Sequence, residues 1–324
     1  MITARGLARR FAGRGRAEVH AVQGVDLDVA AGELVAFLGP NGAGKTTTLR
    51  MLTTLLRPTG GTATVAGHDL RTDPVGVRRG IGYVAQGGGC SPETTVTGEL
   101  VMQGRLHRMS KADATAKAAE LCARLDLDGL GERAAKTLSG GERRRLDIAV
   151  GLVHGPKLVF LDEPSTGLDP HSRANLWEHI RRLRDEHGTT VFLTTHYLDE
   201  ADALADRVLV LDHGRIVAEG TSDSLKSQVS GDAVALGVEA ESVAAAARIA
   251  SAFPGAREVS TSDDGVAFRV PRGDSAVPEL LRLLAEDGVA MRSVQVRRPT
   301  LDDVFLALTG RSLRDAGQEA AHVA

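Results

Sequence analysis

A glycine-rich loop, Gly39-Pro-Asn-Gly-Ala-Gly-Lys-Thr46, stands between a short apolar run at 35–38 and a segment with helical periodicity. The leucines of that segment recur at steps of three or four residues, as on one face of a helix that Pro58 should end: Leu49, Leu52, Leu55 and Leu56. In a strand, glycine loop and helix of this kind, backbone N–H groups and the helix N-terminus converge on phosphate oxygens. The loop therefore predicts an α/β fold built around a phosphate site.

Three further apolar runs, at 158–161, 191–193 and 208–211, are separated by stretches with helical spacing. This pattern is typical of parallel strands covered by helices on both faces. Pro170 fits the first turn of one connecting helix, and Gly188 fits its C-terminal cap. We expect residues 1–220 to form one α/β domain, in which a segment at about 93–135, rich in Ala, Lys, Glu and Leu, forms an inserted helical subdomain.

The composition changes after Gly220 to a polar stretch, and we interpret residues 221–231 as a linker. Beyond it, the pattern over 232–297 predicts β-α-β-β-α-β, a ferredoxin-like unit. A last helix is expected at 301–308, so the small C-terminal α+β domain spans 232–310 and is followed by a tail at 311–324.

Composition narrows the class of protein. The 324 residues suffice for two domains, and 42% hydrophobic with 25% charged residues is ordinary for a soluble globular chain. A net charge of −3 gives no overall attraction to nucleic acid, which is not expected as a partner. Cys90 and Cys122 lack disulfide or zinc spacing and indicate a reducing cytosol. The N-terminus has no secretory-signal pattern, and no apolar run approaches the roughly 20 residues that span a bilayer, so a membrane role would require a partner.

Four residues are candidates for chemistry on a bound nucleoside triphosphate. Lys45 would supply a positive charge to the β- and γ-phosphates, and Thr46 would supply a hydroxyl to Mg²⁺. Asp162 ends an apolar strand, where its carboxylate would meet the metal ion through water. Glu163, one step further out, would orient or deprotonate the attacking water as a general base.

Two more polar residues end predicted strands on the same edge of the sheet. His196 follows the strand at 191–195 and would hydrogen-bond the γ-phosphate or the attacking water, although a solitary histidine is more often structural. Gln86 follows the run at 81–85 and would join the metal shell when the helical subdomain moves inward. An ordinary surface glutamine is the alternative for Gln86.

The segment Leu138-Ser-Gly-Gly-Glu142 fits a capping box, and a plain helix start is one interpretation. Its glycines also permit the close approach of a phosphate. Because residues 39–46 already enclose the phosphates bound by this chain, the phosphate of a second subunit is the better target for this helix start. The sequence thus predicts a head-to-tail homodimer with two shared sites.

Taken together, these motifs resemble those of the ATP-binding-cassette (ABC) ATPases. The Walker A loop corresponds to 39–46, the glutamine loop to Gln86, the signature to 138–142, Walker B to 158–162, the Asp-loop to 165–169 and the switch histidine to His196. The resemblance implies ATP and Mg²⁺ as ligands, with Lys45, Glu163 and His196 as catalytic residues and Thr46, Gln86 and Asp162 at the metal. It also implies an adenine-stacking aromatic near the N-terminus, for which Phe11 is the candidate. The implied nucleotide-binding set is Phe11, Gly39, Pro40, Asn41, Gly42, Ala43, Gly44, Lys45, Thr46, Thr47, Gln86, Ser139, Gly140, Gly141 and Asp169.

One departure from the family pattern is Glu142, where many members have glutamine. A glutamate preserves the helix cap but adds a negative charge near the phosphate of the partner. We expect the three arginines that follow it to offset that charge: Arg143, Arg144 and Arg145.

Two segments, Pro299-Thr-Leu-Asp-Asp-Val-Phe-Leu-Ala-Leu-Thr-Gly310 and Thr195-His-Tyr-Leu-Asp-Glu-Ala-Asp202, resemble the daunorubicin/doxorubicin-resistance type of ATP-binding subunit in multidrug exporters. This resemblance implies an ATPase that dimerises around Mg-ATP and drives a separate integral membrane permease from the cytoplasmic side of the membrane. The alternative is a soluble ABC ATPase acting on ribosomes or DNA. That class commonly has two cassettes in one chain or a long coiled-coil insertion, and neither is visible in this sequence.

Overall fold

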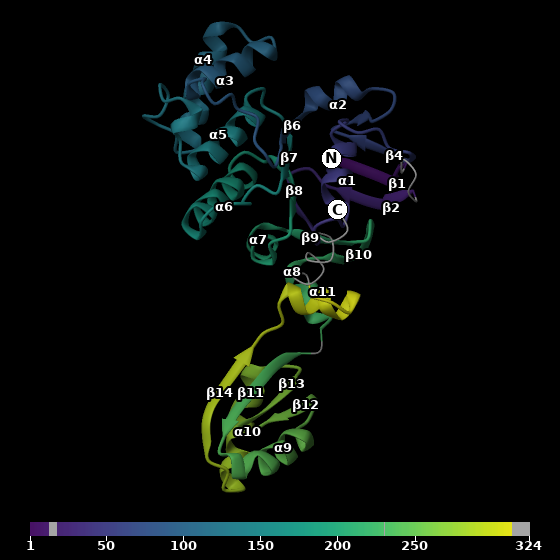
Figure 1. Ribbon diagram of the computed structural model, residues 1–324, viewed down its shortest axis with the longest axis vertical. Helices are drawn as coiled ribbons and strands as arrows, with labels where there is room; N and C mark the ends of the chain where they lie inside the picture. Colours follow the sequence, from purple (N-terminus) through teal and green to yellow (C-terminus); the bar gives the residue numbers. More distant parts are fainter. Residues whose placement is uncertain (13–17, 230, 313–324) are drawn as a thin grey trace. The chain divides into compact units, whose positions relative to one another are not determined.

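The computed structural model describes residues 1–12, 18–229 and 231–312. These residues form two compact units, Met1–Ser222 and Asp223–Ser312. The first unit has a six-stranded sheet in the order β10-β9-β3-β8-β7-β6 (Figure 1). The bounds of these strands are β10 (Arg215–Gly220), β9 (Arg207–Asp212), β3 (Leu34–Leu38), β8 (Thr190–Thr195), β7 (Leu158–Asp162) and β6 (Ile81–Val84).

All pairs in this sheet are parallel except that of the edge strand β10 with β9. Every residue of β3, β7 and β8 is buried. This confirms the parallel strands that the apolar runs predict, because strands covered on both faces have no solvent side on which polar residues would alternate. The carboxyl ends of β3, β7 and β8 lie at one edge of the sheet, where the loop at 39–44 begins.

A second sheet of the first unit lies beside helix α1 (Lys45–Leu52) in Figure 1. It is antiparallel, with the order β2 (Val19–Val29), β1 (Ile2–Phe11), β4 (Gly60–Val65) and β5 (His68–Asp69). Its buried side chains share one hydrophobic core with α1 and the central strands, including Leu7, Leu49 and Phe37. Helix α2 (Pro74–Gly80) connects this sheet to β6.

Helix α1 is shorter than the leucine pattern predicts. It ends at Leu52, and Leu55 is 58% exposed instead of extending the buried face. The side chain of Thr53 donates a hydrogen bond to the carbonyl oxygen of Leu49, and Thr54 has a φ of 64°, outside helical geometry. The helix therefore ends well before Pro58, where the backbone leaves helical geometry at Thr54.

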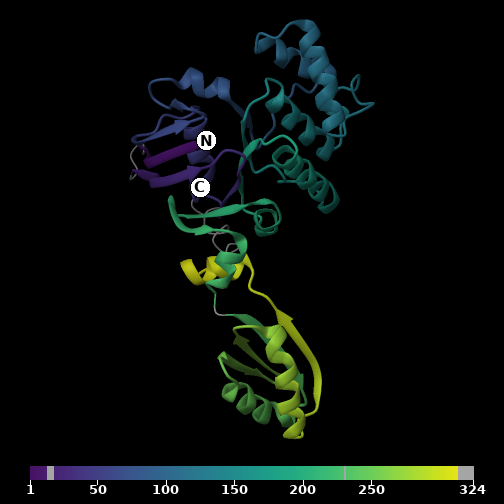
Figure 2. The same cartoon turned by 180° about the vertical axis from the view of Figure 1, so that it is seen from behind.

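The helical insertion predicted around 93–135 is present. It contains α3 (Val96–Leu106) and α4 (Lys111–Arg124), which stand apart from the central sheet in Figures 1 and 2. A short 3-10 turn (Ala135–Thr137) leads to α5 (Gly140–Leu152), which returns to the sheet beside β6. The helices that follow are α6 (Pro170–Asp185), with Pro170 in its first turn as predicted, and α7 (Leu198–Leu204).

The second unit has the predicted β-α-β-β-α-β order. Its elements are β11 (Asp232–Val238), a 3-10 turn (Ala240–Ser242), α9 (Val243–Ala252), β12 (Arg257–Ser262), β13 (Gly265–Val270), α10 (Gly273–Glu286) and β14 (Met291–Arg297). The four strands form an antiparallel sheet in the order β12-β13-β11-β14, with the core between this sheet and the two helices. Helix α11 (Leu301–Thr309) follows, close to the prediction.

The segment at 221–231, which we interpret as a linker, contains the helix α8 (Ser222–Ser227). Beyond Ser312 the predicted tail lies outside the described residues.

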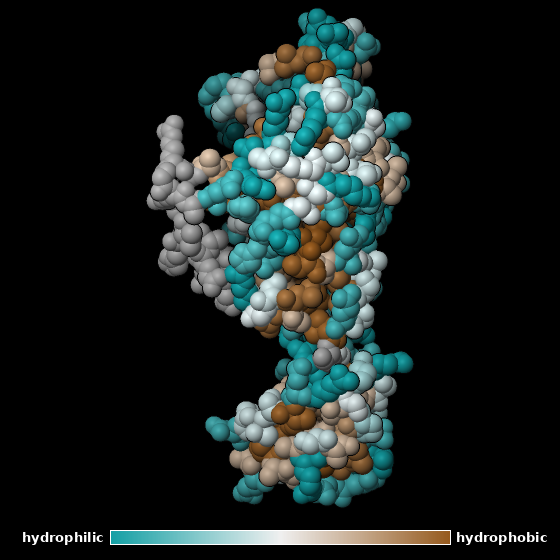
Figure 3. Space-filling model, turned by 90° about the vertical axis from the view of Figure 1, so that its right-hand side faces the viewer, coloured by the Kyte–Doolittle hydropathy of each residue, from teal (hydrophilic) through white to brown (hydrophobic). Residues whose placement is uncertain are grey.

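None of the helices described is long and apolar enough to cross a membrane. On the face drawn in Figure 3, hydrophilic residues surround the apolar ones that reach the surface.

Candidate nucleotide site

The loop between β3 and α1 is held against neighbouring backbone. Gly44 has a φ of 104°, and a Cβ atom there would lie 2.4 Å from the carbonyl oxygen of Ala21. A Cβ atom on Gly39 would lie 2.3 Å from the carbonyl oxygen of Leu211. Glycine is therefore required at both ends of the loop. Helix α1 has no side-chain cap, so its first N–H groups are left for a phosphate, as the motif predicts.

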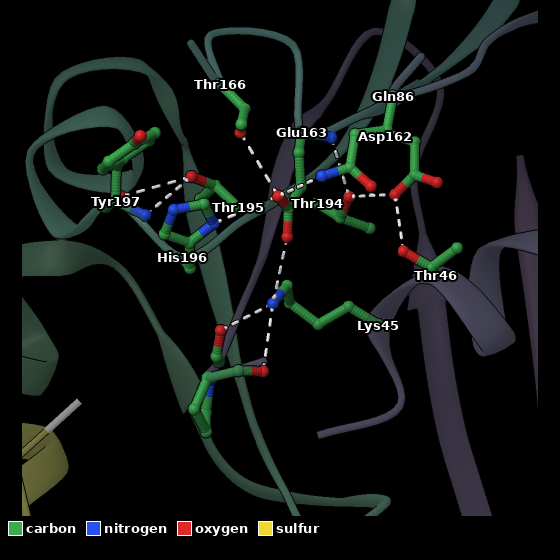
Figure 4. A network of polar contacts seen from close by, with 12 residues as sticks. Lys45, Thr46, Gln86, Asp162, Glu163, Thr166, Thr194, Thr195, His196 and Tyr197 are labelled. Atoms are coloured by element: carbon green, nitrogen blue, oxygen red, sulfur yellow. Dashed lines mark hydrogen bonds and ion pairs between the residues drawn. The ribbon is translucent and has the colours of Figure 1, made fainter. Parts of the chain in front are cut away.

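Lys45, the first residue of α1, is 4% exposed. Its Nζ donates hydrogen bonds to the carbonyl oxygens of Gly39, at 2.8 Å, and Pro40, at 3.1 Å (Figure 4). The same Nζ lies 3.3 Å from Oε1 of Glu163. Burial lowers the pKa of Lys45, and the nearby carboxylates of Glu163 and Asp162 counteract part of that shift. These partners hold the ammonium group at the mouth of the phosphate loop.

Two of the three proposed metal residues, Thr46 and Asp162, are in direct contact, whereas Gln86 bonds Glu163. Oδ1 of Asp162 accepts hydrogen bonds from Oγ1 of Thr46, at 2.9 Å, and from Oγ1 of Thr194, at 2.7 Å. Hydroxyl and carboxylate oxygens suit Mg²⁺, which usually takes one or two carboxylates together with phosphate oxygens and water. The residues present therefore fit this ion. When bound, Mg²⁺ would neutralise charge on the β- and γ-phosphates.

Several side chains contact the carboxylate of Glu163, and only 7% of this residue is exposed. Its Oε2 accepts hydrogen bonds from Nε2 of Gln86, at 3.0 Å, and from Oγ1 of Thr166, at 3.2 Å. Nδ1 of His196 lies 3.1 Å from the same oxygen, although the geometry is not that of an aligned hydrogen bond. Figure 4 shows these side chains converging from β6, β7 and β8.

The charge state of Glu163 follows from this environment. Burial alone would raise the pKa of its carboxyl group, but His196 and Lys45 outweigh burial and lower the pKa to about 2. The side chain is thus a carboxylate at neutral pH that can orient a water molecule. Because a low pKa also makes it a weak base, loss of the ion pair with Lys45 would raise the carboxyl pKa and favour deprotonation of that water.

The structure brings six of the predicted residues together: Lys45, Thr46, Gln86, Asp162, Glu163 and His196. Asp169 instead caps α6, where its carboxylate accepts hydrogen bonds from the backbone of His171 and Ser172. Phe11 is 37% exposed on β1, and the guanidinium carbon of Arg9 lies 4.6 Å from the centre of its ring. Nucleotide contacts by Asp169 and Phe11 remain predictions.

The capping box at the start of α5 is confirmed. Oγ of Ser139 accepts a hydrogen bond from the backbone N–H of Glu142 at 3.3 Å, and Oε2 of Glu142 accepts one from the N–H of Ser139 at 2.7 Å. Ser139 and Gly140 are exposed, as contact with a second subunit requires.

The expectation that Arg144 offsets the charge of Glu142 is wrong, because Arg144 is buried and donates its hydrogen bonds to backbone carbonyl groups.

Sequence reasoning did not place three residues of this site, Thr166, Thr194 and Arg144. Thr194 joins the two acidic residues, since its hydroxyl donates to Asp162 and accepts from the backbone N–H of Glu163 at 3.0 Å. A pair of threonines ending an otherwise apolar strand was the available signal for Thr194. Arg144 lies within a run of three arginines, and nothing in the sequence distinguishes it from its neighbours.

Comparison with known proteins identifies the family. Residues 22–166 match the ABC transporter family, and residues 220–309 match the family described as ATP-binding protein DrrA1-3-like, C-terminal domain. The chain is 49% identical to the daunorubicin/doxorubicin resistance ATP-binding protein DrrA of Streptomyces peucetius, over 93% of this chain and 92% of the relative. The chain belongs to the DrrA-type ABC transporter ATP-binding proteins.

Other members of the ABC family are also similar to this DrrA-type chain. The doxorubicin resistance ATP-binding protein DrrA of Mycobacterium tuberculosis (strain ATCC 25618 / H37Rv) is 42% identical over 91% of this chain and 90% of the relative. The Nod factor export ATP-binding protein I of Rhizobium meliloti is 39% identical over 91% of this chain and 85% of the relative.

A solved ATP-binding cassette, dimeric in a post-hydrolysis state with ADP and Pi, matches with a TM-score of 0.63 and 25% identity. The match covers 68% of this chain and 98% of the solved chain. The DrrA-type chain thus has the ABC cassette fold and is an ATPase, as the resemblance implied.

Proposed function

We propose that this chain is the ATP-hydrolysing subunit of an exporter that moves a drug or antibiotic-like compound through a separate integral membrane permease. It would act at the cytoplasmic side of the membrane. The observation that carries the proposal is the convergence of Lys45, Asp162, Glu163 and His196 in a chain whose C-terminal region matches the DrrA type over residues 220–309.

In the proposed cycle two copies enclose two ATP molecules. The exposed Ser139 and Gly140 of each copy contact the nucleotide held by Lys45 of the other. The solved cassette with ADP and Pi is likewise a dimer. Thr46 and Asp162, which contact each other, would hold Mg²⁺ on each nucleotide together with Gln86. Glu163 orients the attacking water, and His196, beside it, holds the water or the γ-phosphate in place.

Two variants test the catalytic assignment, Lys45→Ala and Glu163→Gln. We expect Glu163→Gln to bind ATP and form a stable dimer while its turnover falls by about 100-fold or more, because the general base is removed. Lys45→Ala should instead lose ATP affinity, since its positive charge on the phosphates is gone. Steady-state ATPase assays and fluorescent-nucleotide titration separate the two outcomes, and full turnover in Glu163→Gln would contradict the role of Glu163.

Partner identity is tested by co-purification from membranes. We expect an affinity-tagged chain to recover a polytopic membrane protein encoded beside it, and the pair to confer resistance on a drug-sensitive host. Resistance should disappear with Glu163→Gln at equal expression. Recovery with ribosomes or DNA, and none with a membrane protein, would favour a soluble ABC ATPase and contradict the exporter.

A further inference from the structure

Helix α5 carries a buried arginine whose role neither the motifs nor the proposed function explains. Arg144 is 6% exposed, and each of its three nitrogen atoms donates a hydrogen bond to a backbone carbonyl group. Nε bonds Pro164 and Nη1 bonds Ala85, both at 2.7 Å, and Nη2 bonds Asp162 at 3.0 Å. Its ion pair with Oδ2 of Asp147 is long, at 3.9 Å.

A buried guanidinium group held mainly by carbonyl groups is costly in a core, where an apolar side chain would fill the same volume. Its planar fork reaches these three carbonyl groups and, at 3.4 Å, that of Glu163, which a lysine of the same charge does not do. The carbonyl groups come from two separate segments, the end of β6 and the end of β7. Arg144 therefore ties these two strand ends to one helix.

The first tied segment is the loop that carries Gln86. Arg144 bonds the carbonyl group of Ala85, directly before Gln86, and Oδ1 of Asp147 accepts a hydrogen bond from the N–H of Gly89 at 3.1 Å. Asp147 lies one turn beyond Arg144 on α5 and is 7% exposed. One turn of α5 thus holds the glutamine loop at both of its ends.

The second tied segment is the backbone of Glu163. Its φ of 45° lies in the left-handed region, which a glutamate adopts only when its surroundings hold it there. Thr194 binds the N–H of Glu163 from one side, and Arg144 binds the flanking carbonyl groups of Asp162 and Pro164 from the other. The side chains of Glu163 and Gln86 then meet at 3.0 Å.

We propose that Arg144 is a positioning residue for hydrolysis, which holds the Gln86 loop and the backbone of Glu163 of its own subunit in one geometry. The proposal rests on the proposed function, because it takes Glu163 as the hydrolytic carboxylate of a dimer. Arg144 touches neither nucleotide nor water in this role. Its loss should lower kcat and leave the KM for ATP within about twofold, since misplacement of about 1 Å at a reacting group costs up to about 100-fold in rate.

Two mixed dimers, made by co-expressing differently tagged copies, test whether Arg144 acts within its own subunit. In the first, one copy carries Arg144→Lys and the other carries Glu163→Gln, so the remaining Glu163 has lost its own Arg144. In the second, one copy carries both substitutions and the other is unchanged, so the remaining Glu163 keeps its Arg144. We expect turnover of the first dimer to be about tenfold or more below that of the second.

Equal turnover of the two dimers, or a loss confined to the second, would overturn the proposal, since a general packing defect affects both alike. Arg143→Lys is the matched control on the same helix, and an equal loss with it would also contradict the role of Arg144. If no ATP-dependent dimer forms even with Glu163→Gln, the proposed function fails. The kinetics of the single Arg144→Lys variant then still test the role of Arg144. A lower kcat with an unchanged KM for ATP would support it, and an unchanged kcat would contradict it.

Discussion

At the scale of single residues, Asp162 and Glu163 are adjacent acids with different partners. The carboxylate of Asp162 accepts two hydroxyl groups, whereas that of Glu163 lies against Lys45 and His196. Asp162 is the last residue of β7, whereas Glu163 lies just beyond the strand with a φ of 45°, so the two side chains leave the backbone in different directions. One strand end therefore supplies two acids for the two roles that we propose, Mg²⁺ binding by Asp162 and orientation of the attacking water by Glu163.

Glu163 should make the stability of the first unit depend on acid pH. Its pKa falls from 4.5 to about 2 on folding, so ionised Glu163 stabilises the fold above pH 4.5 by about 3 kcal/mol at about 1.36 kcal/mol per pKa unit. That contribution is lost as the pH falls from 4.5 towards 2. Urea unfolding of wild type and Glu163→Gln between pH 7 and pH 3 measures it. The wild-type free energy of unfolding should fall more steeply below pH 5, and parallel curves would contradict the low pKa.

At the scale of elements, the three helices around the site begin in different ways. Helix α5 starts with a capping box and α6 with the carboxylate of Asp169, whereas α1 has no side-chain cap. The S-x-x-E pattern and Pro170 predict two of these starts from local sequence. The end of α1 was mispredicted, because the backbone leaves helical geometry at Thr54, and leucine periodicity does not indicate where this happens.

The loop before α1 should not tolerate alanine at Gly44. The positive φ and the carbonyl oxygen of Ala21, 2.4 Å from the new Cβ atom, require the loop to move away from the core. We expect Gly44→Ala to weaken ATP binding by about tenfold or more and to lower Tm, both measured by thermal shift with and without nucleotide. Gly87→Ala is the control, since its Cβ atom would meet nothing within 4 Å. Wild-type ATP affinity in Gly44→Ala would refute the steric argument.

At the scale of the whole molecule, the chain has two units with separate cores. The core of the first unit joins both of its sheets through α1, and the core of the second lies between its antiparallel sheet and the helices α9 and α10. All of the residues that converge around Glu163 belong to the first unit. Nucleotide binding should therefore not depend on the second unit.

Removal of the residues after Gly220 tests this separation. We expect the shortened chain to bind ATP with an affinity within about threefold of wild type, because its phosphate loop and its core are intact. Dimer formation or permease assembly should weaken. Nucleotide titration and analytical ultracentrifugation with ATP measure the two properties, with Lys45→Ala in the shortened chain as the non-binding control. Loss of ATP binding on removal of these residues would contradict the prediction that the first unit binds nucleotide without the second.

Features encoded by neighbouring residues were predictable from the chain alone. These are the glycine loop, the buried parallel strands, the capping box of Ser139 and the β-α-β-β-α-β order after 232. Each depends on spacing or on backbone preferences over a few residues. The same local information placed Lys45, Asp162, Glu163 and His196 at strand or loop ends that face one edge of the sheet.

The partners and charge states at that edge depend on tertiary structure. The low pKa of Glu163 requires Lys45 and His196 within about 3 Å, and the burial of Arg144 requires the ends of two different strands. Such distances arise only when segments far apart in the chain pack together. A sequence pattern reports which side chains are present, whereas electrostatic and hydrogen-bond energies depend on distances through space that folding sets.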